Sequence, residues 1–242
     1  MTTLFISDLH LDASRPAIST LFLEFLQREA QAAEALYILG DLFEAWVGDD
    51  DPSETGDVVA TGLRAVSDTG VPVFFIRGNR DFLLGHDYAA RAGMRLLPDP
   101  AVVMLYGKPI LLMHGDLLCT ADTDYQSFRT QTRNPVWQQQ FMAQSLEARM
   151  AFAMQARAAS QVHQANLRGD GGNARFASIT DVAPEAVDIT LARFGINTLI
   201  HGHTHRPDIH RNDAGTRIVL GDWYEQGSVL RMDADGYALD AL

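Results

Sequence analysis

The sequence of 242 residues is long enough for one large α/β domain, and its 47% hydrophobic and 21% charged residues are typical of a globular protein. No apolar run approaches the roughly 20 residues of a membrane-spanning helix, and the N-terminus lacks the basic start of a secretory signal. A single cysteine, Cys119, excludes a disulfide framework and fits a reducing compartment, and the net charge of −12 argues against a nucleic-acid partner.

The first third of the chain alternates between short apolar runs and amphipathic segments. Residues 3–7, 36–39 and 73–76 predict strands, and residues 16–33 and 54–68 predict the helices between them. This alternation favours a parallel sheet that is covered on both faces. Gly107-Lys108 divides two further apolar runs into a predicted hairpin. The last third predicts a helix over 185–194 and strands over 198–201, 218–220 and 228–232.

The middle of the chain differs in charge and in pattern. From Asp122 to Phe176 there are six arginines and four acids, so this stretch carries +2 and the remainder −14. An anion-binding surface and an ordinary solvated helix explain the excess about equally well. Residues 136–166 predict one long helix, followed by a glycine-rich loop at 168–173. An apolar stripe in that helix is expected to pack on the core, or otherwise to form an adaptable surface for a flexible ligand; its members are Met142, Leu146, Met150 and Met154.

Polar motifs stand at the ends of the predicted strands or just beyond them. Because the carboxyl ends of parallel strands converge on one crevice, residues that are distant in sequence are expected to meet there. Burying so many polar groups without partners costs several kcal/mol each, and bound divalent ions remove that cost. A purely structural role is therefore disfavoured. The motifs are SDLH, GD, GN, HG and GHTH, and their side chains are Asp8, His10, Asp41, Asn79, His114, His203 and His205.

The order of these motifs resembles that of the calcineurin-like metallophosphoesterases, through almost the whole chain. Within them, SDLHL, LGDLFEAWVGDD, RGNRDF, HGHTHRP and GDWYEQGSVL are similar to the UDP-2,3-diacylglucosamine pyrophosphohydrolases of lipid A biosynthesis. The resemblance implies an α/β fold, a β-sandwich with α/β/β/α layers, formed by residues 1–121 and 177–242. Residues 122–176 would be a helical insertion that forms a lid. The implied reaction cleaves the acylated UDP-sugar into UMP and 2,3-diacylglucosamine 1-phosphate (lipid X), by attack of an activated water on the α-phosphorus.

The same resemblance implies two Mn²⁺ ions per subunit. Mixed imidazole, carboxylate and amide ligands without thiolate suit a borderline divalent ion. Two such ions, roughly 3.5–4 Å apart, clamp the oxygens of an in-line displacement and lower the pKa of a shared water. Asp41 and His203 are accordingly expected to be catalytic as well as ligands. One ion is expected on Asp8, His10 and His205 and the other on Asn79, His114 and His203, with Asp41 bridging both.

Arg80, the residue after Gly-Asn, indicates the kind of substrate. Many relatives in the wider superfamily have a histidine here, placed to assist a departing alkoxide. Arginine cannot give up a proton, but its planar fork holds a phosphate. A phosphate leaving group needs no protonation, because its second pKa is only about 6. Arg80 is therefore predicted to be catalytic on a phosphoanhydride, and Asp81 either to orient Arg80 or to cap the following helix.

Substrate recognition is assigned to the insertion by the resemblance. The apolar face of residues 136–166, together with Trp46, is expected to line the acyl chains, and the arginines of the segment to meet an anionic membrane surface. We therefore expect a cytoplasmic monomer that associates peripherally with the inner membrane. The predicted substrate contacts are Asn79, Arg80, Asp122, Ser160, Gln164, Arg175 and His203.

Two other functions are compatible with the metal motifs. A metallophosphoesterase for soluble nucleotides would not need the basic, methionine-rich insertion. A binding module that has lost hydrolysis would be expected to have lost metal ligands, whereas this chain retains all seven candidates. A nuclease is disfavoured by the acidic charge and by the lack of a continuous basic groove.

Overall fold

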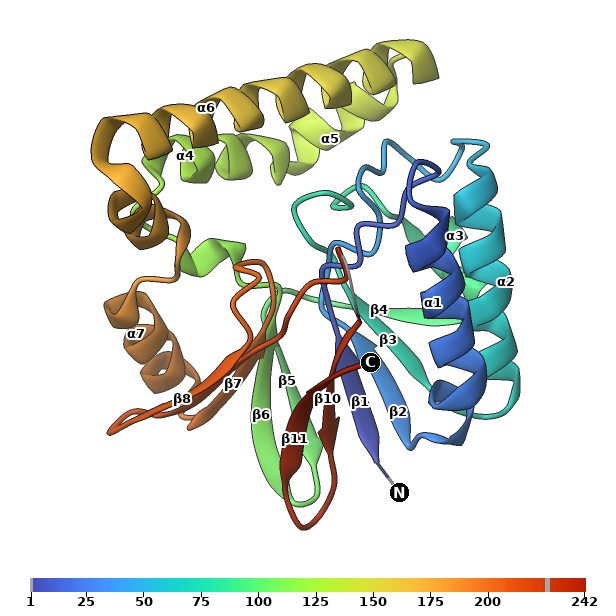
Figure 1. Ribbon diagram of the computed structural model, residues 1–242. Helices are drawn as coiled ribbons and strands as arrows, with labels where there is room; N and C mark the ends of the chain where they lie inside the picture. The colour runs from blue at the N-terminus through green and yellow to red at the C-terminus, as the bar shows by residue number, and fades with distance from the viewer. Residues whose placement is uncertain (1, 225–226) are drawn as a thin grey trace.

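Two β-sheets packed face to face form the centre of the computed structural model (Figure 1). The structure describes residues 2–224 and 227–242, except for seven side chains at 164, 170, 171, 173–175 and 177. The six-stranded sheet has the order β11-β10-β1-β2-β3-β4 and is parallel from β1 to β4. Its strands are β1 (Thr3–Ile6), β2 (Ala35–Ile38), β3 (Val73–Ile76), β4 (Met94–Leu97), β10 (Ser228–Met232) and β11 (Tyr237–Ala241).

The second sheet has five strands in the order β5-β6-β7-β9-β8. Its first two strands form the predicted hairpin, with Tyr106 and Gly107 in the turn and both residues at positive φ. β6, β7 and β9 run parallel to one another, so the ends of β6 and β7 lie side by side. The strands are β5 (Ala101–Leu105), β6 (Lys108–Met113), β7 (Thr198–His201), β8 (Asp208–Asn212) and β9 (Gly215–Val219).

Helices cover the outer face of each sheet. Alternate residues of β1 show how the layers form, since Leu4 and Ile6 join the core beneath the helices while Phe5 points into the core between the sheets. The α/β/β/α architecture is thus confirmed. The parallel sheet is covered on both faces as expected, by helices on its outer face and by the second sheet on its inner face. The outer helices are α1 (Pro16–Arg28), α2 (Glu54–Asp68) and α3 (His86–Ala92) on one side and α7 (Pro184–Phe194) on the other. Short 3₁₀ turns, η1 (Ala30–Ala32) and η2 (Asp116–Leu118), complete the core.

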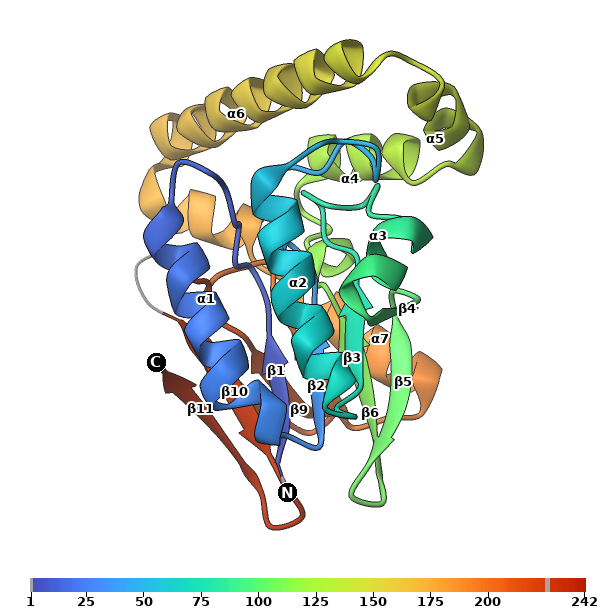
Figure 2. The ribbon, with the colours of Figure 1, turned by 90° about the vertical axis from the view of Figure 1, so that its right-hand side faces the viewer.

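Three further helices lie above the carboxyl ends of the strands, at one end of the sandwich (Figures 1 and 2). They are α4 (Thr123–Thr132), α5 (Pro135–Met142) and α6 (Leu146–Thr180). The single helix expected over 136–166 is therefore two helices separated by residues 143–145. The glycine-rich stretch at 168–173 is not a loop. It lies where two helical segments of α6 meet at a kink, at Gly172, whose dihedral angles of φ 69° and ψ −175° are not helical.

The predicted methionine stripe does not pack on the core. Met142 ends α5, and Met150 and Met154 of α6 are largely exposed. An aromatic cluster holds α5 and α6 together instead. Trp137 stacks on Phe141 at 4.8 Å between ring centroids, and Phe152 of α6 lies 5.1 Å from Phe141. Aromatic pairs at this spacing stabilise a contact by more than the burial of their apolar area alone would.

Candidate metal centre

Asp8, His10 and His205 lie together at the ends of β1 and β7. Oδ1 of Asp8 is 3.2 Å from Nε2 of His205, and Nε2 of His10 is 3.3 Å from the same nitrogen. Donor atoms of all three lie within 4.8 Å of one another, which is close enough to share one cation. The three residues expected to hold the first ion are thus brought together by the fold.

Asn79, His114 and His203 form a second group beside the first. Oδ1 of Asn79 lies 2.9 Å from Nε2 of His114 and 2.8 Å from Nδ1 of His203. Asp41 stands between the groups, with one oxygen 3.7 Å from Nε2 of His10 and the other 3.7 Å from Nε2 of His114. A carboxylate in that position can face two cations at once.

The backbone at these positions is unusual. Five of the seven candidate ligands are non-glycine residues with positive φ, between 50° and 70°, and Tyr106 is the only other non-glycine example in the described chain. Such a conformation costs about 1–2 kcal/mol per residue and is concentrated at functional sites. Gly78 makes room for one of these residues, because a Cβ atom there would clash with Oδ1 of Asp41. The five residues are Asp8, His10, Asp41, His203 and His205.

Burial and charge together set the protonation of the cluster. Burial opposes ionisation of Asp8, but His205, His114 and His10 hold the pKa of that carboxyl well below its usual value. Burial also opposes protonation of His114, yet Asp41, Asp116 and Asp8 raise its pKa to about 9. The pKa of His205 rises against burial to about 10, mainly through Asp8 and Asp222. His203 differs, since burial lowers its pKa to about 4. In the metal-free protein, two imidazoles thus carry protons that a cation would displace.

Hydrogen bonds behind the cluster fix which atoms face inward. Nδ1 of His114 donates to the Leu39 carbonyl at 2.9 Å, which leaves its Nε2 toward Asn79 and Asp41. Nδ1 of His205 lies 3.2 Å from Oδ2 of Asp222, which leaves its Nε2 toward Asp8. Such partners set the tautomer and raise the basicity of a metal-binding histidine. Asp222 belongs to the GDWY motif, but the sequence offered no spacing that connects it with His205.

Asp81 has neither of the roles that the sequence suggested. It is fully buried, accepts the backbone N–H of Gly78 at 2.8 Å through one oxygen and accepts that of Leu42 at 2.7 Å through the other. Asp81 therefore ties the turn that carries Asn79 to the loop that carries Asp41. A single buried carboxylate thus holds two candidate ligand segments in register.

Arg80 lies at the edge of the cluster. Its backbone N–H donates to Oδ1 of Asp41 at 2.8 Å, so the turn itself orients the bridging carboxylate. Its side chain is half-buried, and Nε has no hydrogen-bond partner among the described residues. The positive charge of Arg80 helps to lower the pKa of the buried Glu44 nearby, although burial opposes that shift and His10 contributes more. The guanidinium thus contributes a permanent positive charge beside the cluster.

The predicted substrate contacts divide between the centre and the helices above it. Asp122 caps α4 by accepting the N–H of Tyr125, and its Oδ1 lies 3.2 Å from Nε2 of His163 on α6. Ser160, one turn before His163, is half-buried on the same helix. The Tyr125 ring stacks near His203, at 5.9 Å between centroids, so the start of α4 borders the metal cluster. The side chains predicted at Gln164 and Arg175 lie outside the described residues.

Most arginines of the helical segment point toward the core acids and not toward solvent. Arg129 donates to the buried Asp116 at 2.9 Å, and Arg133 lies 3.7 Å from the same carboxylate. Arg149 is buried, donates to the Val47 carbonyl and forms a two-pronged pair with Asp50. The basic excess of this segment is therefore used largely to fasten α4 and α6 to the core, which the sequence did not indicate.

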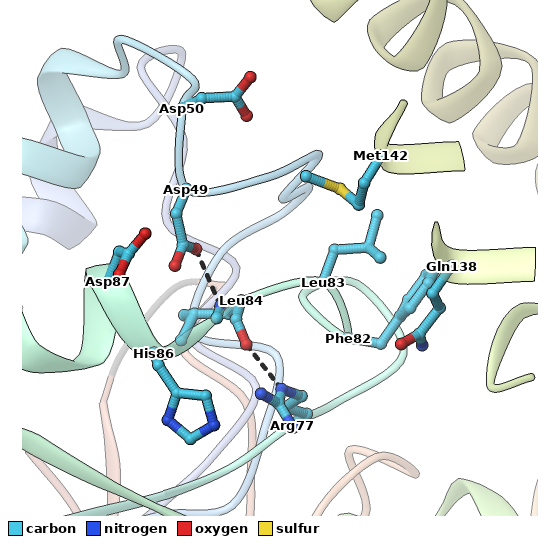
Figure 3. Close-up of a pocket in the computed structure, with 11 residues that line it drawn as sticks. Asp49, Asp50, Arg77, Phe82, Leu83, Leu84, His86, Asp87, Gln138 and Met142 are labelled. Carbon is cyan, nitrogen blue, oxygen red and sulfur yellow. Dashed lines mark hydrogen bonds between the residues drawn. The ribbon is translucent and has the colours of Figure 1, made fainter. Parts of the chain in front are cut away.

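A pocket of about 460 Å³ adjoins the turn that carries Arg80. Figure 3 shows that its lining comes from the loop before α2, the turn after β3, the start of α3 and the helix α5. Phe82, Leu83, Leu84 and Met142 give it an apolar side, and Asp49, Asp50, Asp87 and Arg77 a charged side. Trp46, expected to line an acyl path, is instead buried in the core against Phe43 and Tyr88.

Comparison with known proteins places the chain among phosphoesterases. A sequence model of the calcineurin-like phosphoesterase family matches residues 1–207. A protein of Stenotrophomonas maltophilia (strain K279a) named UDP-2,3-diacylglucosamine hydrolase is 65% identical, covering 100% of this chain and 99% of its own length. A protein of the same name from Xanthomonas axonopodis pv. citri is also 65% identical with the same coverage. A solved structure described as a novel archaeal phosphodiesterase shares the fold with a TM-score of 0.51 at 12% identity, covering 100% of both chains.

Proposed function

This chain belongs to the calcineurin-like phosphoesterase family, and on that premise we propose that it hydrolyses the diphosphate bond of UDP-2,3-diacylglucosamine to UMP and 2,3-diacylglucosamine 1-phosphate. The observation that carries the proposal is the full-length, 65% identity to relatives named as hydrolases of that compound. The seven clustered side chains and the unpartnered donor of Arg80 support it independently, because they suit a metal-dependent attack on a diphosphate.

Family membership implies a divalent metal, and the donor set fits one. We assign Asp8, His10 and His205 to one Mn²⁺ ion and Asn79, His114 and His203 to another, with Asp41 bridging. Bound ions would supply a hydroxide nucleophile near neutral pH and neutralise charge on the phosphoryl oxygens. The protein's own contribution is to present these ligands already in place. Five of them are at left-handed backbone positions, and Asp81 ties the turn that carries Asn79 to the loop that carries Asp41.

We assign to Arg80 the catalytic role of neutralising charge on the leaving group. Its place in the turn after Asn79, where its backbone N–H donates to Asp41, supports this assignment, because a permanent positive charge there would lie beside the phosphoryl group that the cluster would hold. Because the departing group is itself a phosphate, the reaction needs charge neutralisation there and no proton donor. A leaving group that needs charge neutralisation and no proton explains why an arginine, which cannot act as an acid, follows the Gly-Asn pair.

We propose that α4–α6 are a lid that binds the acylated sugar. Asp122 and Ser160 are assigned to the nucleotide-sugar together with Asn79, Arg80 and His203, and the proposal extends to Gln164 and Arg175. The apolar side of the pocket in Figure 3, formed by Phe82, Leu83 and Met142, lies between the core and this lid and suits part of an acyl chain. No helix in the described chain is long and apolar enough to cross a membrane. We propose peripheral binding to the inner membrane from the cytoplasm, through exposed apolar side chains of the lid.

The experiment that tests this function compares two substrates in oxygen-18 water with added Mn²⁺. UDP-2,3-diacylglucosamine in detergent micelles should be cleaved with the label in UMP, since attack is assigned to the α-phosphorus. Soluble UDP-N-acetylglucosamine should react far more slowly, because it lacks the acyl chains. Equal rates on both substrates would favour an enzyme for soluble nucleotide diphosphates, and label in the sugar phosphate would reverse the assigned leaving group.

A further inference from the structure

Glu44 is a buried carboxylate beside the cluster for which neither the sequence nor the proposed mechanism gives a role. It follows Asp41 by three residues, and its side chain is 7% exposed. Burying an ionised carboxylate is costly unless positive groups surround it. Among the described residues, the groups within ion-pair distance of Glu44 are His10, Arg15 and Arg157.

The two oxygens of Glu44 face different parts of the molecule. Oε2 lies 3.1 Å from Nδ1 of His10, and Oε1 lies 3.2 Å from Nη2 of Arg157 on α6. The other ring nitrogen of His10, Nε2, faces the cluster and lies 3.7 Å from Oδ2 of Asp41. One carboxylate therefore connects the outer side of a candidate metal ligand with a helix of the lid.

The contact with His10 is close but not complete. Nδ1 of His10 is buried and makes no hydrogen bond of regular geometry with a described residue, although Oε2 of Glu44 is within reach. A small rotation of the Glu44 side chain would complete that bond. A carboxylate that accepts from Nδ1–H fixes the tautomer that leaves Nε2 free for a metal and makes the imidazole a stronger ligand. Because Arg157 of α6 holds the other oxygen, the position of α6 on the core affects this rotation. We call the docking of α6 against the core in this position the seating of α6.

We propose that Glu44 is a positioning residue that couples the seating of α6, through Arg157, to the metal affinity of the centre, through His10. Thermodynamic linkage makes the coupling reciprocal, so a bound ion also strengthens the seating of α6. The inference rests on the metal centre proposed above and is independent of which substrate the enzyme hydrolyses.

Calorimetric titration of the full-length metal-free protein with Mn²⁺ tests the first half. Glu44→Gln is expected to weaken binding by about 10–100-fold, the usual effect of removing a partner behind a ligand. Arg157→Gln is expected to weaken it several-fold in the native background and not at all when Glu44→Gln is present. Arg168→Gln, on the same helix but with its guanidinium over Phe176, is the matched control and should leave affinity unchanged. If the double variant loses Mn²⁺ affinity by the sum of the two single effects in free energy, Arg157 acts only as a distant charge. That result would refute the coupling.

Hydrogen exchange tests the second half without any substrate. Added Mn²⁺ should slow exchange of the α6 amides around Arg157 in the native chain and leave them unchanged in Glu44→Gln, with α7 as the internal reference. Equal slowing in both proteins, or Mn²⁺ affinity of Glu44→Gln within twofold of native, would overturn the proposal. A native chain that binds no Mn²⁺ would contradict the metal centre itself. Failure to hydrolyse the UDP-sugar would contradict only the proposed function.

Discussion

Arg80 has a chemistry that a metal site by itself would not require. We expect Arg80→Ala to lower kcat/KM on UDP-2,3-diacylglucosamine by about 10²–10³-fold, the usual loss when one group that stabilises developing charge is removed. Arg80→Lys should recover part of that loss, because it restores the charge without the planar fork. Metal content, measured by atomic emission, should stay at the native level in both variants, since the Arg80 side chain is not a ligand. Activity of Arg80→Ala within twofold of native would remove Arg80 from the mechanism.

The histidines of the cluster predict how metal binding depends on pH. Each ordinarily has a pKa of about 6.5, and in the metal-free fold that of His114 is raised to about 9 and that of His205 to about 10. Because the folded values are raised, these imidazoles stabilise the metal-free fold fully below about pH 6.5, and that contribution is lost as pH rises through 9 to 10. A cation needs both imidazoles unprotonated, so its binding releases protons and its affinity rises over the same window.

Calorimetry in two buffers of different ionisation enthalpy measures this release directly. At pH 7 we expect about two protons released when the cluster is filled with Mn²⁺. The gain in melting temperature on adding Mn²⁺ should accordingly grow between pH 6.5 and pH 9. Binding that releases no proton would mean that His114 and His205 are not both ligands.

At the scale of the element, α6 presents apolar side chains that no described part of the chain covers. Met154 is 72% exposed and Val162 is 60% exposed. If this helix meets the bilayer, the double substitution Met154→Glu with Val162→Glu should lower binding to phosphatidylglycerol vesicles by at least about tenfold, since burying each side chain contributes about 1.5–3 kcal/mol. Co-sedimentation with the vesicles measures it.

The matched control for that measurement is Ile189→Glu. Ile189 is as exposed as the two lid residues but lies on α7, which covers the outer face of the second sheet (Figure 1). Its substitution should leave vesicle binding unchanged. An equal loss in the control would show a general effect of added negative charge on an already acidic protein, and the lid would have no special part in membrane binding.

At the scale of the whole molecule, the candidate metal centre lies where the two sheets meet. Asp8, Asp41 and Asn79 follow strands of the six-stranded sheet, whereas His114 and His203 follow strands of the other. A bound ion should therefore stabilise the sandwich as a unit. At a free Mn²⁺ concentration of 100 times Kd we expect about 2.7 kcal/mol, or a rise of about 5–10 °C in Tm for a chain of this size.

Calorimetric melting with and without a chelator checks this expectation. Asp41→Asn should abolish most of the rise, because it weakens the ligand that stands between both groups of donors. Glu24→Gln, which removes only an exposed pair with Arg28 on α1, should keep the full rise. A Tm that is indifferent to metal in the native chain would mean that the clustered side chains do not hold an ion.

The sequence by itself determined what depends on short-range pattern. Apolar runs bounded by polar turns located β1, β2, β3 and the β5–β6 hairpin within a residue or two, because strand pairing and burial follow local periodicity. The order of the motifs identified the seven side chains that the fold brings together. The phosphate leaving group indicated by the arginine after Gly-Asn stays a prediction, which rests on the chemistry of that side chain and on the histidine that many relatives have in its place.

Only the tertiary structure decided which distant groups face each other. Nothing in the local pattern connects Asp222 with His205, or Glu44 with Arg157, because contacts across a long stretch of chain depend on how the layers pack. For the same reason the arginines of the insertion, expected to face an anionic surface, were found mostly on core acids. The methionine spacing predicted one helix whose stripe packs on the core or else forms an adaptable surface. The aromatic cluster of α5 and α6 supplies the packing instead, and Met150 and Met154 are left exposed. Periodicity reports which face of a helix is apolar, and the fold alone determines what that face meets.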